Sequence, residues 1–232
     1  MFAEFASPTF WLALVEIIGI NVLLSGDNAV VIALACRSLP DHQRNKAVMG
    51  GSAAAVGLRV VFCLIIVWLL SIPYLKLIGG LLLLWIGIKL MLPEGEPDEN
   101  GVAAKSNLWG AIQTVAIADM VMSLDNVVAI AAAAKGSTTL IVIGLIISVP
   151  LIIFGSQLVL RLLERFPILV VAGGGLLGWI AGEIISSDEK VQGWLSMDHH
   201  LLEQIAKPAL TVFVVAVGML LARRKSAAAS HG

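Results

Sequence analysis

Apolar stretches long enough to cross a lipid bilayer recur along the whole chain, and they limit its possible folds more than any other feature. A helix needs about 20 mainly apolar residues to span a hydrocarbon core about 30 Å thick. The composition agrees, because 59% of the 232 residues are hydrophobic, 13% are charged and the mean hydropathy is +0.96. The runs are continuous rather than alternating, which excludes a membrane β-barrel. The sequence therefore predicts an all-α polytopic membrane protein.

About seven transmembrane helices are expected, with boundaries uncertain by about 2–4 residues. They are 8–35, 47–70, 73–92, 107–134, 138–162, 167–186 and 208–222. Pro8, Pro73, Pro167 and Pro208 stand near predicted helix starts, where a missing N–H does no harm. The expected organisation is membrane repeat 1 (1–92), an acidic cytoplasmic linker (93–106), membrane repeat 2 (107–187), an external loop (188–207), and a C-terminal helix with a basic tail (208–232).

The basic residues indicate the orientation in the membrane. Cytoplasmic loops carry an excess of Lys and Arg, whereas acidic residues have little influence. Most basic residues fall in alternate loops or in the C-terminal tail: Arg37, Arg44, Lys46, Lys105, Arg161, Arg165, Arg223, Arg224 and Lys225. We therefore expect a multi-pass protein of the cell (inner) membrane, with the N-terminus outside and the C-terminus in the cytoplasm.

The two halves of the chain repeat one another. The segment FWLALVEIIGINVLLSGDNAVVIALA aligns without gaps on LWGAIQTVAIADMVMSLDNVVAIAAAA, so that Trp11 matches Trp109 and SGDN matches SLDN. With a small gap upstream, Pro73 matches Pro167. Each repeat contributes an odd number of spans, which turns the second copy over relative to the first. The result is the inverted-repeat architecture of many secondary transporters, whose binding site lies near the bilayer midplane.

Both halves carry acidic and amide groups inside apolar spans, where a carboxylate costs at least about 2.5 kcal/mol. On an ideal helix, residues at i, i+4 and i+7 share one face. Each half has such a polar triad: Asp119, Ser123 and Asn126 in the second, and Asn21, Ser25 and Asn28 in the first. Carboxylate, amide and hydroxyl oxygens are ligands of hard divalent cations such as Mg²⁺, Ca²⁺ and Mn²⁺. The candidate metal ligands are Asp27, Asn28, Asp119, Asp125, Asn126, Glu16, Asn21, Ser25 and Ser123.

The backbone of the first motif could add ligands. Gly26 follows Ser25 there and would let the helix bend or unwind. Unwinding would free carbonyl oxygens, as it does in the discontinuous helices of transporters.

A purely structural role is the alternative for these groups. Asn and Ser in membrane spans often serve only as hydrogen bonds between helices, worth about 0.6 kcal/mol. Asp27 and Asp125 could form buried salt bridges with Arg59 or Lys89, the basic residues inside or at the edge of spans. Arg59 and Lys89 cannot easily neutralise all four acids within the spans, which favours ion or proton binding. These acids are Glu16, Asp27, Asp119 and Asp125. Two roles are possible for Arg59: it is a charge partner that occupies the empty site, or it is a structural counter-ion.

The segments GINVLLSGDNAVVIALA and ADMVMSLDNVVAIAAAA resemble the TerC family of membrane proteins, and the resemblance extends from about residue 10 to residue 225. It implies manganese export from the cytoplasm and a wider kinship to lysine-exporter-like and cation-exchanger-like transporters. Asn21 stands where the second half has Asp119, so the site would be chemically asymmetric. On this sequence the acidic-motif positions of the family are Asp27, Asn28, Asp125 and Asn126, with Asp119 preceding the second motif.

The expected function is secondary transport that exports divalent metal cations, Mn²⁺ first and Ca²⁺ as the alternative, in exchange for protons. We expect no enzymatic activity and no resident cofactor. The expected partners are the lipid bilayer and divalent metal ions, with a homodimer left open. Nucleic acid is not expected, because a net charge of −1 leaves no basic surface. Two other classes stay open: an intramembrane aspartyl protease that uses the motif aspartates, and a membrane scaffold of a metal or tellurite stress-response complex.

Overall fold

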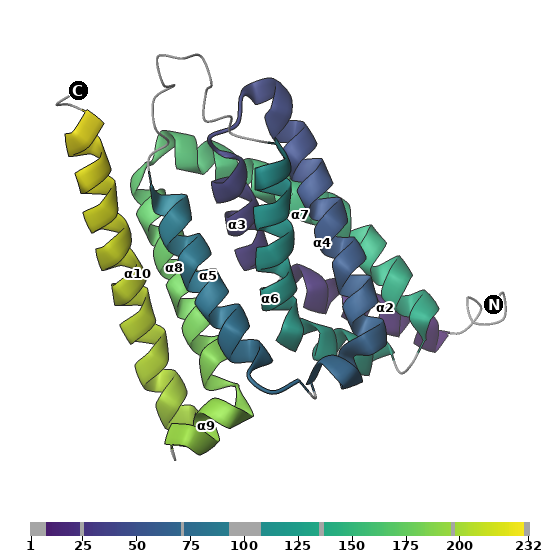
Figure 1. The fold of residues 1–232 in the computed structure, drawn as a ribbon. Coiled ribbons are helices and arrows are strands. Elements are labelled where there is room, and N and C mark those ends of the chain that lie inside the picture. The colour runs from purple at the N-terminus through teal and green to yellow at the C-terminus, as the bar shows by residue number, and fades with distance from the viewer. Residues whose placement is uncertain are drawn as a thin grey trace.

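The computed structural model describes residues 8–23, 26–70, 72–92, 108–134, 137–195 and 198–229. Every regular element in these ranges is a helix, which confirms the predicted all-α class (Figure 1). In chain order the helices are α2 (Pro8–Leu23), α3 (Gly26–Cys36), α4 (Asp41–Leu70), α5 (Leu75–Met91), α6 (Leu108–Ala134), α7 (Thr138–Arg165), α8 (Ile168–Ser186), α9 (Glu189–Leu195) and α10 (His199–Ala229).

The helices have the length and surface of a multi-pass membrane protein. Among the described residues, α4, α7, α8 and α10 are long and apolar enough to cross a bilayer, and up to six spans result if two bent segments each count as one. The remaining predicted span is α5, whose 17 residues extend about 26 Å, slightly less than the hydrocarbon core. Large apolar side chains point outward, as lipid contact requires. Leu12, Phe154 and Val212 are 71%, 72% and 66% exposed.

Two helices begin earlier than the hydropathy pattern indicates. α10 begins at His199 rather than near 208, so Pro208 lies inside the helix and not at its start. The stretch 188–207, expected as a loop, therefore holds α9 and the first turns of α10. α4 likewise begins at Asp41 rather than near 47. The first turns of α4 and α10 are polar, and for this reason hydropathy alone does not assign them to a membrane helix.

The halves pack as an inverted repeat requires. The second helix of each half contacts the first segment of the other half, so that α4 packs on α6 while α7 packs on α2 and α3. The third helices, α5 and α8, pack on each other, and α10 lies at the edge beside α8 and α5 (Figure 1). The start of α4 meets the end of α7, where Arg44 pairs with Glu164. The second helices are therefore antiparallel, which is consistent with one repeat being inverted relative to the other.

Basic residues from alternate connections gather at one end of the molecule. Arg37 Nη2 donates to the Leu92 carbonyl at 3.3 Å, which joins the ends of α3 and α5. Arg44 donates to the carbonyls of Leu39 and Arg37, both at 2.8 Å, besides its pair with Glu164 at the end of α7. The C-terminal end of α10 lies at this same end (Figure 1). We refer to it below as the basic end.

Glycines allow α8 to approach α10 closely. A Cβ atom at Gly178 would lie 2.6 Å from the Leu210 carbonyl oxygen, and one at Gly182 would lie 2.7 Å from the Lys207 Cα. Both neighbours are backbone atoms that cannot move aside alone. Gly173–Gly175 also face neighbouring helices closely. The glycines of α8 therefore serve helix packing, a common use of small residues in membranes.

Candidate ion-binding site

Both motif-bearing segments bend at the motif. The axes of Thr9–Asn21 and Gly26–Cys36 differ by 47°, and those of Leu108–Leu124 and Asn126–Ala134 differ by 64°. The sequence left open whether the first helix is broken at Gly26, and in the structure a new helix begins at that residue. The bend in α6 has no glycine in its motif, so no local pattern indicated it. The first segment is therefore interrupted at its motif, whereas α6 bends at its motif and continues as one helix.

A buried cluster around Arg59 of α4 joins the two halves. The Arg59 side chain is 1% exposed. Its Nε donates to Ser123 Oγ at 2.9 Å, its Nη2 donates to Asp119 Oδ1 at 2.5 Å, and its Nη1 donates to Asn21 Oδ1. Ser123 Oγ also donates to Asp119 Oδ2 at 3.1 Å. Both carboxylate oxygens of Asp119 are thus hydrogen-bonded, and one of them is paired with a cation.

The first half uses neutral groups where the second half uses charges. Asn21, which aligns with Asp119, is fully buried, and its Nδ2 donates to Ser148 Oγ of α7. The Ser148 hydroxyl lies 2.8 Å from the Leu145 carbonyl oxygen. Each of the two aligned residues is therefore contacted by the second helix of the other half: Asp119 by Arg59 of α4, and Asn21 by Ser148 of α7. The chemical asymmetry expected from Asn21 is present, and Ser148 is a partner that sequence reasoning did not identify, because a single serine in an apolar span carries no distinguishing pattern.

Asn28 borders a small cavity beside this cluster. Asn28 is 3% exposed, and neither Nδ2 nor Oδ1 has a hydrogen-bond partner among the described residues. With Asp119 it lines a cavity of about 10 Å³ that is otherwise apolar, enclosed by Val31, Ile32 and Val115. Such a volume holds about one water molecule or ion. Because an unpaired buried polar group costs about 1–3 kcal/mol, this amide is suited to a ligand that would pair with it.

Asp27 lies next to the cluster at the start of α3. Its carboxylate is partly buried, and its Oδ1 accepts a hydrogen bond from the Asn28 backbone N–H at 2.8 Å. It is close enough to Arg59 and Asp119 to interact electrostatically with both. A cation at the cavity would therefore find the Asp119 carboxylate, the Asn28 amide and, nearby, a second carboxylate.

The structure does not bring every candidate ligand to this place. Glu16 lies on the exposed face of α2, and Asn126 is partly buried just beyond the α6 bend. Ser25 and the side chain of Asp125 lie outside the described residues. Among the side chains that are described, no group of three or more His, Cys, Asp and Glu is placed to hold a metal ion.

One expectation about these residues needs correction. The triad of Asn21, Ser25 and Asn28 does not share one helix face, because the break puts Asn21 on α2 and Asn28 on α3. Arg59 pairs with Asp119 and also interacts electrostatically with Asp27, while the side chain of Asp125 lies outside the described residues. Lys89 is exposed and stands over the Trp85 ring at 4.9 Å from its centroid.

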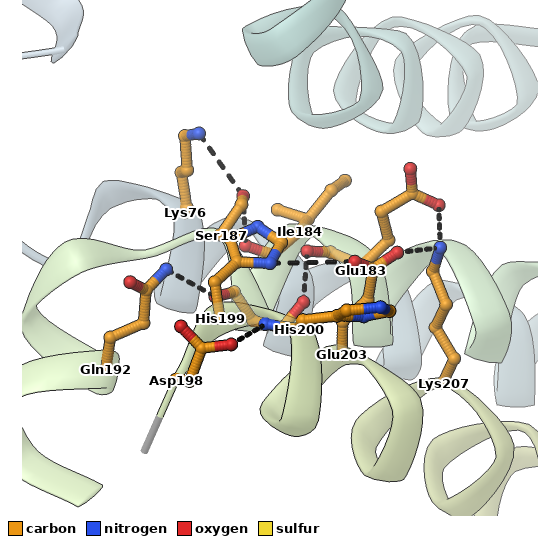
Figure 2. A network of polar contacts seen from close by, with 11 residues as sticks. Lys76, Glu183, Ile184, Ser187, Gln192, Asp198, His199, His200, Glu203 and Lys207 are labelled. Atoms are coloured by element: carbon orange, nitrogen blue, oxygen red, sulfur yellow. Dashed lines mark hydrogen bonds and ion pairs between the residues drawn. The ribbon is translucent and has the colours of Figure 1, made fainter. Parts of the chain in front are cut away.

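A second polar network lies where α8, α9 and α10 meet (Figure 2), at the end of the molecule opposite the basic end (Figure 1). Lys207 of α10 pairs with Glu183 of α8 at 3.1 Å and also with Glu203. Lys76 Nζ of α5 donates to Ser187 Oγ at 3.2 Å. These contacts connect α5, α8 and α10 where the helices end. Because the Glu183 and Glu203 carboxylates are partly exposed and already salt-bridged, we interpret this network as a structural contact between helices.

A larger cavity adjoins that network. It has a volume of about 340 Å³ and is lined by the α4–α5 connection, by Ser187–Lys190, and by Leu124 of α6. Leu124 is the residue before Asp125, at the bend of α6. The cavity therefore extends from this end of the molecule to the second acidic motif.

The long apolar helices, two of their segments bent at polar motifs, define a multi-pass helical membrane protein, and its antiparallel second helices are consistent with an inverted repeat. The chain belongs to the TerC family of integral membrane proteins, whose sequence profile matches residues 6–229.

Bacterial membrane proteins are among its relatives. The chain is 44% identical over 206 residues to the membrane protein YjbE of Bacillus subtilis, covering 89% of this chain and 93% of YjbE. It is 28% identical over 188 residues to YkoY of the same organism, covering 73% and 58% of the two chains. Identity to the inner membrane protein YgdQ of Escherichia coli is 26% over 183 residues, covering 72% and 77%. No solved structure matches the chain.

Proposed function

We propose that this protein is a secondary transporter of the inner membrane that exports divalent metal cations, Mn²⁺ first, from the cytoplasm in exchange for protons. The observation that carries the proposal is the unpaired Asn28 amide, which faces the same small buried cavity as the Asp119 carboxylate. Amide and carboxylate oxygens suit hard divalent cations. The preference for Mn²⁺ over Ca²⁺ rests on membership of the TerC family.

The cation enters from the basic end, which faces the cytoplasm by the excess of Lys and Arg in its loops. It is held between α3 and α6 and leaves when the two halves rock against each other. The cavity of about 340 Å³ that reaches Leu124 supports this direction, because it offers a path from the α6 bend to the opposite end.

Protons are suited to replace the cation once it leaves. The formal charges of Asp27, Asp119, Asp125 and Arg59 sum to −2. One divalent cation or two protons would neutralise them. An unneutralised pair of charges within the membrane is costly, so exchange is favoured over release alone.

Flux measurements in proteoliposomes test the proposal. Vesicles that hold a pH-sensitive dye are given Mn²⁺ or Ca²⁺ at clamped potential, with wild type, Asp125→Asn, and Asp98→Asn as a control acid in the linker. We expect wild type and Asp98→Asn to move Mn²⁺ with opposite proton flow. Asp125→Asn should lose at least about tenfold in flux, because it removes a charged ligand, and a tenfold loss corresponds to about 1.4 kcal/mol. Mn²⁺ flux without proton counterflow would rule out the coupling. Equal activity of wild type and Asp125→Asn would remove the role of the motif.

A further inference from the structure

We infer that Arg59 is the resident cation of the unloaded site, and that the transported cation competes with it for the carboxylate of Asp119. The inference rests on the proposed function and deepens it, because it assigns the occupant of the site between transport events and gives Arg59 a role in cation affinity.

The geometry places Arg59 where the cargo has to bind. The cavity beside Asn28 is lined by Asp119, and the Asp119 carboxylate already accepts from Arg59 Nη2 on one oxygen and from Ser123 Oγ on the other. A metal ion that coordinates Asp119 must therefore take an oxygen that is already engaged. Two cations on one buried carboxylate repel each other strongly at low local dielectric, so binding of one weakens binding of the other.

The guanidinium has other acceptors when the carboxylate is taken. Nη1 donates to Asn21 Oδ1 and Nε donates to Ser123 Oγ, so these hydrogen bonds can remain while Nη2 gives up Asp119. Arg stays charged in proteins, so this cation cannot leave the site as a proton can. Arg59 thus behaves as a tethered counter-ion that returns to Asp119 each time the cargo leaves.

A purely structural counter-ion predicts the opposite effect on affinity. If Arg59 only held the helices in place, its removal would distort the site and weaken cation binding. If Arg59 competes with the cargo, its removal strengthens binding. The sign of the change in Mn²⁺ affinity therefore separates the two roles.

The test measures equilibrium binding of radiolabelled Mn²⁺ to the detergent-solubilised full chain. We expect Arg59→Gln to bind Mn²⁺ at least about tenfold more tightly than wild type, because a buried positive charge next to the ion is removed. Lys89→Gln is the matched control. It removes one positive charge from an exposed position on α5 and should leave the affinity unchanged.

A double-mutant cycle checks that the competition acts through Asp119. Arg59→Gln should strengthen Mn²⁺ binding by a clearly larger factor when Asp119 is intact than when Asp119→Asn is also present. Arg59→Lys serves if Arg59→Gln does not fold, because lysine keeps the charge but lacks the planar fork of donors. It should give a smaller gain in affinity.

The outcomes separate this inference from the proposed function. Unchanged or weaker Mn²⁺ binding by a folded Arg59→Gln or Arg59→Lys variant would overturn the competition, and so would an equal gain with and without Asp119→Asn. Both results leave the transporter proposal intact. Absence of saturable Mn²⁺ and Ca²⁺ binding by the wild type would overturn the proposed function and this inference together.

Discussion

Asn28 and Ser52 each bury a polar side chain that has no hydrogen-bond partner in the described part of the chain, but only Asn28 lines the cavity next to Asp119. We expect Asn28→Leu to lower Mn²⁺ flux at least about tenfold while thermal stability stays equal or rises, since replacing an unpaired buried amide with an apolar group removes a cost of about 1–3 kcal/mol. Transport assays and thermal unfolding in detergent measure the two effects. Ser52→Ala is the control and should keep full flux; an Asn28→Leu variant with normal flux would contradict the site.

Glu16 is where the structure and the sequence lead to different predictions. The sequence places it among the candidate ligands, whereas in the structure it lies on the exposed face of α2. Glu16→Gln should therefore leave Mn²⁺ flux within about twofold of wild type, because an exposed substitution away from the site usually changes stability by less than about 0.5 kcal/mol and removes no proposed ligand. A loss comparable to that of Asp125→Asn in the same assay would return Glu16 to the site.

The residue types of the site could be predicted from sequence, but their partners could not. Repeated acidic and amide positions identified Asn21, Asn28, Asp119 and Ser123, all of which the structure buries. Arg59 was recognised as a cation within a span, yet its pairing with Asp119 depends on how α4 packs on α6. Contacts between residues 60 positions apart follow from tertiary packing, and local spacing contains no information about them.

The helices show the same division between local and tertiary information. All predicted apolar segments occur as helices, and Gly26, which the sequence marked as a place where the first segment could bend or unwind, is where a new helix begins. The 64° bend of α6 has no such local signal. The early starts of α4 and α10 were missed because polar turns extend a membrane helix without adding to its hydropathy.

The contact between α8 and α10 gives a prediction with an unusual sign. Alanine normally stabilises a helix interior relative to glycine by about 1 kcal/mol, but a Cβ at Gly178 would lie 2.6 Å from the Leu210 carbonyl oxygen. Gly178→Ala should therefore destabilise the protein by about 1–3 kcal/mol through overpacking, measured by thermal unfolding in detergent. Gly193→Ala in α9, where a Cβ meets nothing within 4 Å, is the control and should be neutral or stabilising.

The orientation of the whole molecule in the membrane can be tested by labelling its two ends. The basic end is proposed to be cytoplasmic, and α9 lies at the opposite end (Figure 1). In a chain with the buried Cys36 and Cys63 replaced by alanine, Gly193→Cys should react with a membrane-impermeant maleimide in intact cells. Arg224→Cys should react only after the membrane is permeabilised. The reverse pattern would invert the topology and the proposed direction of export.

Arg59 of α4 is a charged group of the first half that contacts both Asn21 and Asp119, whereas the contact that α7 of the second half makes with Asn21, through Ser148, joins neutral groups. In a carrier with two identical inverted halves, a two-fold rotation would convert the inward-open form into the outward-open form, so both forms would have the same free energy. A fixed charge on one side of the pseudo-two-fold axis removes that equivalence. On the proposed mechanism the empty carrier therefore rests preferentially in one of the two forms, and its forward and return steps need not have equal rates.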